Sequence, residues 1–380
     1  MKLCLITILI LCMFNTIFAQ DTAKFNNNLL LDYYQTQRYD KAADYLKLNN
    51  PEPITSIKTL KALAYCMQMQ GHLPEAETYY QRVYQIDSTN TAVLFSLGNI
   101  NLNRGNLPKA EIWYKKILSK DSTNFMVYKQ LATINVQNNN FATALIYLIK
   151  ANELNSIDAD IAAGLSDLLI NIKQYDKAEK VLNQAIETDT ENMELLESLV
   201  KLEYSQSKWA QTIINCEKLM RLGNMSGPVL TKLGIAYFYL KDYKCSIESL
   251  ALIDVMAQNE TTCYYTAESY KALKDYTNAV TWYYKTIQIG ISPNINNYYS
   301  EIADIYQTRR KFNKAETAYQ KALQFYEKPL TYYMLAALYD TDLKNKKKAL
   351  FYYKKFLSSK PKSDMQKYIT YAKSRISVPY

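Results

Sequence analysis

The fold is decided by two neighbouring stretches, LKALAYCMQMQGHLPEAETYYQRVYQIDSTN at residues 60–90 and LFSLGNINLNRGNLPKAEIWYKKILSKDSTN at residues 94–124. In each stretch, two segments carry apolar residues three or four positions apart, and a glycine-containing turn separates them. This spacing predicts two amphipathic helices joined by a tight turn. Both stretches end on the same tetrapeptide, Asp-Ser-Thr-Asn. The sequence therefore predicts a helical hairpin that occurs at least twice.

A 34-residue period extends this pattern along the chain. A small residue recurs at intervals of 34, with one interval of 33 and one of 36 near the end: Ala42, Ala76, Ala110, Ala144, Ala178, Thr212, Ser246, Ala279, Ala315 and Ala349. Small residues let two antiparallel helices approach closely, while large residues one turn away fill the gaps. One hairpin cannot bury its own apolar stripe, so the repetition predicts a stack of hairpins.

The spacing and residue types resemble those of the tetratricopeptide repeat family. In the third repeat the residues at family positions 4, 7, 8, 20, 24 and 27 fit the pattern: Leu94, Leu97, Gly98, Ala110, Tyr114 and Ile117. Asn101 departs from it at position 11, and Ser122 replaces the usual proline at position 32. The resemblance implies an all-α fold, a right-handed α-solenoid of about ten helix-turn-helix repeats with a C-terminal capping helix.

We divide the chain into a signal peptide (1–19), a repeat solenoid (20–363), and a capping helix with a short tail (364–380). The boundaries of the ten predicted repeats are 23–56, 57–90, 91–124, 125–158, 159–192, 193–226, 227–259, 260–293, 296–329 and 330–363.

The N-terminus has the pattern of a secretory signal peptide. Lys2 precedes an apolar run from Leu3 to Phe14, and the small residue Ala19 precedes Gln20, which predicts cleavage after Ala19. The alternative is an uncleaved anchor, because residues 3–19 approach the roughly 20 residues that span a bilayer. No later segment is apolar enough for a transmembrane helix. We therefore expect an exported protein in the periplasm or outside the cell.

Composition argues against catalysis. The chain has one histidine, His72, in a predicted turn without a second histidine or a cysteine nearby. No phosphate-binding loop or nucleophile motif occurs, so we expect no enzyme activity and no cofactor. Once a signal peptide is removed, four cysteines remain: Cys66, Cys216, Cys245 and Cys263. They are expected to be buried thiols, with a disulfide as the alternative in an oxidising compartment.

The candidate binding residues lie on the first helix of each repeat. At 100° per residue, positions 2, 5, 9, 12 and 13 lie opposite the core positions 4, 7, 8 and 11. In the family this side lines the groove that receives peptides. Here it carries Lys61, Tyr65, Phe95, Asn99, Lys129, Asp160, Asp167, Glu197, Lys201, Tyr204, Phe238, Tyr239, Tyr264, Glu268, Lys271, Asp304 and Tyr333. Some of these side chains are alternatively expected to pack against the next repeat.

The C-terminal end is basic. Residues 296–380 hold 17 Lys or Arg and 7 Asp or Glu, a net charge of +10, and include a lysine run at Lys344, Lys346, Lys347, Lys348, Lys354 and Lys355. The sequence favours a non-catalytic scaffold of a bacterial cell envelope that binds a protein or peptide. Binding of a glycan or polyanion to the tyrosine-lined and basic surfaces is the alternative. Nucleic acid is not an expected partner, and the oligomeric state does not follow from the sequence.

Overall fold

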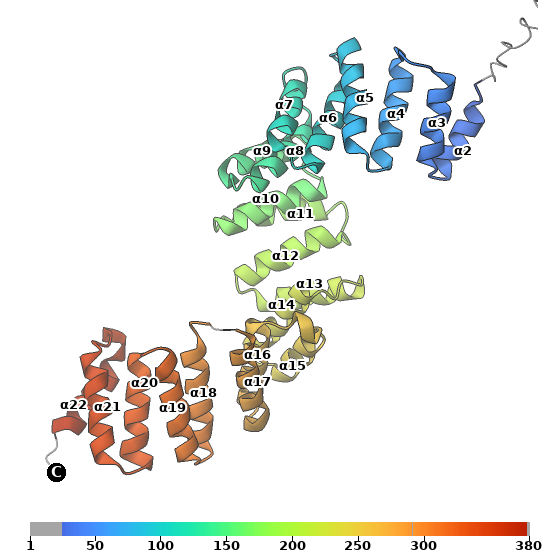
Figure 1. The fold of residues 1–380 in the computed structure, drawn as a ribbon. Helices are drawn as coiled ribbons and strands as arrows, with labels where there is room; N and C mark the ends of the chain where they lie inside the picture. The colour runs from blue at the N-terminus through green and yellow to red at the C-terminus, as the bar shows by residue number, and fades with distance from the viewer. Residues whose placement is uncertain (1–24, 291, 378–380) are drawn as a thin grey trace, which may run out of the picture. The chain divides into compact units, whose positions relative to one another are not determined.

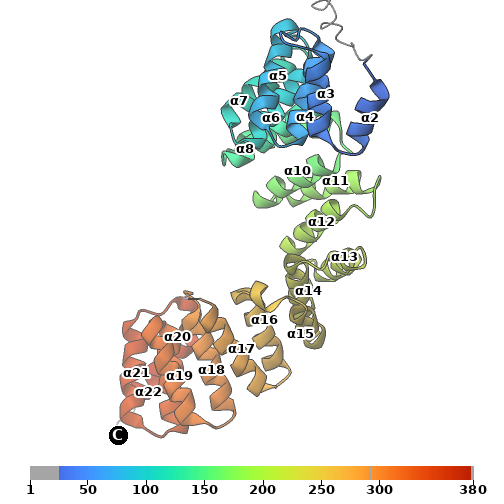
Figure 2. The same cartoon turned by 45° about the vertical axis from the view of Figure 1, so that its right-hand side comes forward.

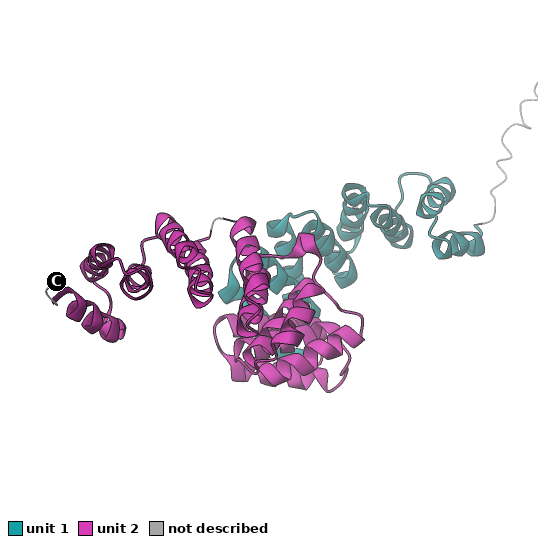
Figure 3. Ribbon diagram, turned by 90° about the horizontal axis from the view of Figure 1, so that it is seen from below, with its two compact units in different colours: residues 1–156 teal, residues 157–380 magenta. Residues whose placement is uncertain are grey.

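The computed structural model describes residues 25–290 and 292–377, and within these residues helices are the regular structure and no strand forms. The all-α prediction is therefore confirmed for the described residues. The predicted signal peptide lies outside them. The chain divides into two compact units, residues 1–156 (unit 1) and 157–380 (unit 2), which Figure 3 colours separately.

Unit 1 is a series of helical hairpins that follow one another in chain order (Figure 1). Each hairpin joins two helices through a turn of three residues, and the second helix of a hairpin packs on the first helix of the next. The helices are α2 (Asn27–Gln35), α3 (Tyr39–Asn49), α4 (Ile57–Met69), α5 (Leu73–Ile86), α6 (Thr91–Asn103), α7 (Leu107–Leu118), α8 (Phe125–Gln137) and α9 (Phe141–Leu154).

Unit 2 is also built from helical hairpins in chain order, as Figure 2 shows from a second direction. Its helices are α10 (Ala159–Asn171), α11 (Tyr175–Ile186), α12 (Met193–Ser205), α13 (Trp209–Arg221), α14 (Gly227–Tyr239), α15 (Tyr243–Ala251), α16 (Glu260–Ala272), α17 (Tyr276–Ile289), α18 (Ile295–Thr308), α19 (Phe312–Phe325), α20 (Pro329–Ala337), α21 (Lys346–Ser358) and α22 (Gln366–Ser377). The predicted capping helix is α22, which packs on α21 and buries Ala372.

The Asp-Ser-Thr-Asn tetrapeptide starts the next hairpin. The Asp87 carboxylate accepts hydrogen bonds from the backbone N–H and the hydroxyl of Thr89, at 2.9 and 2.7 Å. Asn90 then caps α6, because its side-chain oxygen accepts a hydrogen bond from the backbone N–H of Val93. The copy at residues 121–124 makes the same contacts before α8.

A residue in the left-handed backbone conformation ends the first helix of each hairpin. Gly71 and Gly105 hold this position with φ of 80° and 73°, and the backbone N–H groups that follow close the helix end. In the other hairpins residues with a side chain adopt the same conformation: Gln37, Asn139, Lys173, Ser207, Lys241, Lys274, Arg310 and Lys344. The turn is therefore imposed by helix packing even where glycine is absent.

Small residues bring the two helices of a hairpin together. All ten small residues of the 34-residue series, from Ala42 to Ala349, are buried. A Cβ added at Gly98 would lie 2.6 Å from Cε1 of Tyr114, and one at Gly234 would lie 2.6 Å from Cγ of Leu250 and 3.2 Å from the backbone oxygen of Ser246. The helix backbones thus approach as closely as glycine allows.

We predict that Gly234→Ala destabilises unit 2. Alanine improves helix propensity by up to about 1 kcal/mol, but overpacking costs about 1–3 kcal/mol. Urea unfolding followed by circular dichroism should give a lower transition midpoint. Gly227→Ala is the matched control on the same helix, because nothing lies within 4 Å of its added Cβ. Equal midpoints for the two variants would contradict the close-approach argument.

A buried carboxylate joins two neighbouring hairpins of unit 1. Glu77 on α5 accepts hydrogen bonds from Asn101 at 3.2 Å and from Arg104 and Lys109 at 2.5 Å. Burial alone would raise the pKa of Glu77, but the hydrogen bonds from Lys109 and Asn101 and the two positive charges outweigh burial and hold the pKa below its usual value. This contact explains Asn101, which replaces the apolar residue expected at that position.

We predict that Glu77→Gln lowers the stability of unit 1 at pH 7 by roughly 1–2 kcal/mol, as expected for lost charge-assisted hydrogen bonds. Because the folded pKa of Glu77 is lowered, its contribution is present above the usual glutamate pKa and is lost as pH falls through the folded pKa. Urea unfolding at pH 7 and at successively lower pH should therefore show a shrinking difference from the unsubstituted protein. Glu75→Gln, at an exposed position of α5, is the control.

The four cysteines Cys66, Cys216, Cys245 and Cys263 are free thiols, and Cys245 alone of them is not fully buried. The disulfide alternative is therefore wrong for this structure. Burial raises the pKa of Cys216 to about 12, so its thiol is a packing group and not a nucleophile.

Candidate binding surface

Three pockets follow one another along the first helices of the hairpins in unit 2. We call the surface that carries them, formed by α10, α12, α14, α16, α18 and α20, the first-helix face. The first pocket has a volume of about 370 Å³ and lies across α10, α12 and α14. Neighbouring first helices pack on one another here, α10 on α12 and α12 on α14. Side chains far apart in the sequence therefore line one cavity.

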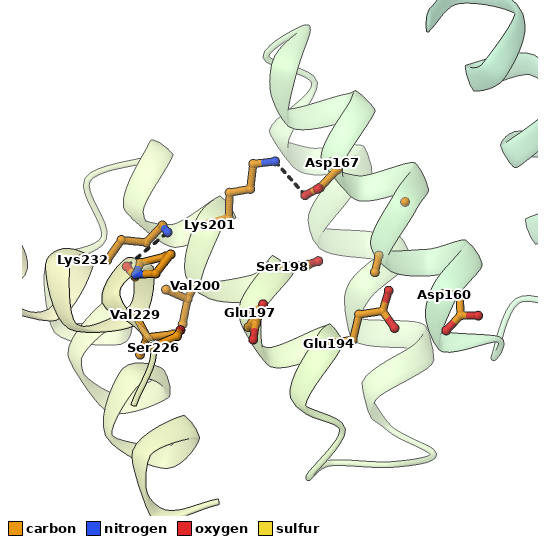
Figure 4. Close-up of a pocket in the computed structure, with 13 residues that line it drawn as sticks. Asp160, Asp167, Glu194, Glu197, Ser198, Val200, Lys201, Ser226, Val229 and Lys232 are labelled. Carbon is orange, nitrogen blue, oxygen red and sulfur yellow. Dashed lines mark hydrogen bonds and ion pairs between the residues drawn. The ribbon is translucent and has the colours of Figure 1, made fainter. Parts of the chain in front are cut away.

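Six of the 13 residues that line the first pocket are charged (Figure 4). Two predicted residues form an ion pair across it, because Nζ of Lys201 lies 3.0 Å from Oδ1 of Asp167. Glu197, also predicted, accepts a hydrogen bond from the side chain of Asn224. The charged lining comprises Asp160, Asp167, Glu194, Glu197, Lys201 and Lys232. Carboxylates thus outnumber ammonium groups by four to two.

Lys232 is less basic than an exposed lysine. Burial lowers its pKa, since removal from water disfavours the charged ammonium. Its Nζ donates to the backbone oxygen of Pro228 at 3.4 Å. The first pocket therefore has a predominantly acidic character.

An aromatic cluster borders the second pocket, whose lining includes Tyr204, Tyr264 and Tyr265. It comprises Tyr204, Trp209, Phe238, Tyr239, Tyr264 and Tyr265, from α12, α13, α14 and α16. Trp209 and Tyr239 stack with their ring centroids 4.4 Å apart and an interplanar angle of 7°. The hydroxyls of Tyr239 and Tyr265 lie 3.1 Å apart. Four of these six residues were predicted from the sequence, and the structure brings them together.

The second pocket, which we call the tyrosine pocket, has a volume of about 530 Å³. Four tyrosine side chains and two carboxylates dominate its lining: Tyr204, Tyr264, Tyr265, Tyr298, Glu260 and Glu301, with Thr261, Asn294 and Asn297 completing it. Tyr264 and Tyr298 face each other with ring centroids 5.6 Å apart. The tyrosine pocket thus combines aromatic surface with negative charge.

The third pocket, of about 310 Å³, lies where α16, α18 and α20 meet. The predicted residue Lys271 donates to Glu301 and lies 3.2 Å from the predicted Asp304. Desolvation alone would lower the pKa of Lys271, but these two carboxylates outweigh it and raise the pKa. This lysine therefore remains charged and ties α16 to α18.

Other predicted residues of unit 2 contact the core or the cap. Glu268 accepts a hydrogen bond from the hydroxyl of Tyr283, and burial raises its pKa. Tyr333 was wrongly placed on the binding side, because it is position 4 of its predicted repeat, a core position; it packs against Tyr368 of the capping helix, with ring centroids 4.7 Å apart. These two side chains stabilise the solenoid in addition to any contact with a partner.

The predicted residues of unit 1 divide in the same way. Tyr65 packs edge-on against Tyr34 and Tyr39 of the preceding hairpin. Phe95 packs against Tyr114, whose hydroxyl donates to Asn99 at 2.5 Å. The remaining two residues are half-buried, Lys61 on α4 and Lys129 on α8. Tyr65 therefore packs between hairpins, which was the alternative to partner binding for a single aromatic side chain.

Comparison with known families gives four matches along the chain. Tetratricopeptide repeat models match residues 68–125, 135–202, 297–328 and 330–363. The chain belongs to the tetratricopeptide repeat family. Proteins of this family generally act as non-catalytic scaffolds for protein–protein interaction.

Several solved structures are similar to this tetratricopeptide repeat protein. A tetratricopeptide repeat protein from Parabacteroides merdae is 16% identical with a TM-score of 0.46, and the match covers 64% of this chain and 96% of that chain. The C-terminal part of a repeat-containing protein from Cytophaga hutchinsonii is 15% identical with a TM-score of 0.47, covering 71% and 98%. Pseudomonas aeruginosa pilF is 21% identical with a TM-score of 0.46, covering 53% and 92%.

The predicted lysine run of this tetratricopeptide repeat protein lies on and just before α21. Lys344, Lys346, Lys347, Lys348, Lys354 and Lys355 are all exposed. Lys348 pairs with Glu316 at 3.1 Å, and Nζ of Lys355 lies 6.0 Å from the ring centroid of Phe351. Part of the local positive charge is therefore already balanced by the chain itself.

The structure adds no catalytic constellation among the described residues. His72 precedes α5 in an exposed turn. Within residues 25–290 and 292–377 no three His, Cys, Asp or Glu side chains gather as a metal site. In the same ranges, no helix is both long enough and apolar enough to cross a membrane.

Sequence reasoning missed one row of the first-helix face. Counted from the start of each predicted repeat, position 6 also lines the pockets, where it holds Gly164, Ser198, Lys232, Tyr265 and Glu301. At 100° per residue this position lies about 20° from position 13, which was included. The helical projection could therefore have predicted that position 6 lies on this face, although position 6 was not included among the candidate positions.

Proposed function

We propose that this protein is a non-catalytic scaffold of a bacterial cell envelope that binds a partner protein or peptide along the first-helix face of unit 2. One observation carries the proposal: three pockets occur in succession on first helices, and the same repeat positions line them. A polypeptide also presents a side chain at regular intervals, so a row of pockets suits it better than a single small molecule.

The chemistry of the face supports a protein partner. Tyr and Trp side chains offer large contact area at a low cost in conformational entropy and are enriched at binding hot spots. Here they are held by ring stacking, as between Trp209 and Tyr239, and their positions are set before a partner arrives. Such preorganisation reduces the entropy lost on binding.

The charges disfavour the polyanion alternative on this face. Glu260 and Glu301 line the tyrosine pocket, and carboxylates predominate in the first pocket. An acidic glycan would meet like charge there. The candidate site for a polyanion is the exposed lysine run on and before α21, where Lys348 already pairs with Glu316.

We predict that a photo-crosslinker placed at Tyr239 captures a discrete partner protein. Tyr239 is 47% exposed in the aromatic cluster, so a benzophenone amino acid at this position would face the partner. Phe351 on α21 is 54% exposed and lies outside the first-helix face, so the same substitution there is the matched control. Crosslinked products from cells would be identified by mass spectrometry. The same products from both positions, or no product from Tyr239, would contradict the proposal.

We also propose that residues 1–19 direct export, on the strength of Lys2, the apolar run and Ala19. The expected mature protein begins at Gln20 and is found in the envelope fraction. Mass spectrometry of the N-terminal peptide, together with cell fractionation, tests this prediction. A cytosolic protein that retains Met1 to Ala19 would overturn it.

A further inference from the structure

The tyrosine pocket carries negative charge that no basic lining residue balances. None of the nine described residues that line it is Lys, Arg or His, and the ammonium group of Lys328, outside this lining, donates to the side-chain oxygen of Asn297 at 2.7 Å. Glu301 has a cationic partner, Lys271, but that lysine lines the neighbouring third pocket. Glu260 therefore supplies the unbalanced charge of the tyrosine pocket.

Neutral donors hold the Glu260 carboxylate. Oε1 accepts hydrogen bonds from the hydroxyl of Ser292 at 2.6 Å, from the side-chain amide of Asn294 at 3.3 Å, and from the hydroxyl of Tyr298. The bonds from Ser292 and Tyr298 lower the pKa of Glu260, so the carboxylate stays ionised at neutral pH. All three hydrogen bonds fall on Oε1, which leaves Oε2 for a further donor.

The aromatic lining adds to this preference for positive charge. Burial raises the pKa of the Tyr264 and Tyr265 hydroxyls, so both rings remain neutral at physiological pH. A neutral aromatic ring carries partial negative charge on its face and attracts a cation placed over it. Tyr204, Tyr264, Tyr265 and Tyr298 thus surround a cavity that also contains a carboxylate.

We propose that the tyrosine pocket receives an arginine side chain of the partner protein, an inference that rests on the proposed function. A guanidinium is planar, stacks on aromatic rings and donates several N–H groups in fixed directions. One edge would donate to Glu260, and a remaining N–H group would face the side-chain oxygen of Asn294. The side-chain oxygen of Asn297 already accepts a hydrogen bond from Nζ of Lys328 at 2.7 Å. An ammonium group stacks less well and is more strongly hydrated, so arginine fits this lining better than lysine.

The test uses three short peptides, acetylated and amidated, with the sequence Gly-Ser-Gly-X-Gly-Ser-Gly, in which X is arginine, lysine or citrulline. Citrulline keeps the shape of arginine without its charge. Isothermal titration of the full chain should show the arginine peptide binding at least tenfold more tightly than the citrulline peptide and more tightly than the lysine peptide. Equal affinities for arginine and citrulline, or for arginine and lysine, would overturn the assignment.

Two variants locate the binding. Glu260→Gln removes the charge but keeps an acceptor for Ser292 and Asn294, and it should weaken the arginine peptide about tenfold while leaving the citrulline peptide unaffected. Asn297→Lys adds positive charge at an exposed position of the rim and should also weaken binding of the arginine peptide. Glu248→Gln, exposed on α15 away from the pocket lining, should change nothing. Unchanged arginine affinity in the Asn297→Lys variant would overturn the proposal even if Glu260→Gln misfolded.

The outcome separates this inference from the proposed function. Crosslinking of a partner at Tyr239 does not require Glu260. If the Glu260→Gln variant captures the partner equally and the peptides show no preference for arginine, the proposed scaffold function stands and the arginine assignment is wrong. A photo-crosslinker at Thr261, in the pocket lining, should join the partner through a segment that contains arginine. A product that joins only two copies of this chain would instead assign the pocket to self-association and overturn the proposal.

Discussion

The close approach of paired helices at small residues is the constraint on which the rest of the structure depends. Gly98 and Gly234 leave no room for a Cβ, and all ten small residues of the 34-residue series are buried. Close packing at one level requires a large partner one turn away, which Tyr114 and Leu250 supply. Each hairpin therefore has one permitted register, and repetition of that register generates the stack.

That register also determines what the first helices can display. Because the core positions are committed to packing, the opposite side of each first helix is available for charged and aromatic residues. Neighbouring first helices then place these residues side by side, as Asp167 and Lys201 are across α10 and α12. The binding surface is thus a consequence of the repeat, whereas its chemistry is set by residues that the repeat leaves unconstrained.

The contrast between core positions and surface positions explains which features could be predicted from the sequence. The fold was predictable because the small and large residues recur with the period of the hairpin. Asp167, Glu197, Lys201, Tyr204 and Tyr264 were predictable for the same reason, since a helical projection places them on one side. Trp209 was not, because it belongs to a second helix and reaches Tyr239 only through the tertiary packing. Glu268 was placed on the correct helix, but its hydrogen bond to Tyr283 depends on a partner 15 residues away.

The net charge of a sequence segment does not show on which surface its charged residues lie. Residues 296–380 have a net charge of +10, which by itself suggests an anionic partner. The described structure separates the charges by helix: Glu301 and Asp304 lie on the first helix α18, whereas the exposed lysine run lies on and before the second helix α21. Electrostatic complementarity acts through the local field at a surface, and screening limits its range to roughly 8 Å at physiological salt. The proposed attraction of a basic partner segment to the first-helix face is therefore compatible with the basic net charge of the surrounding sequence.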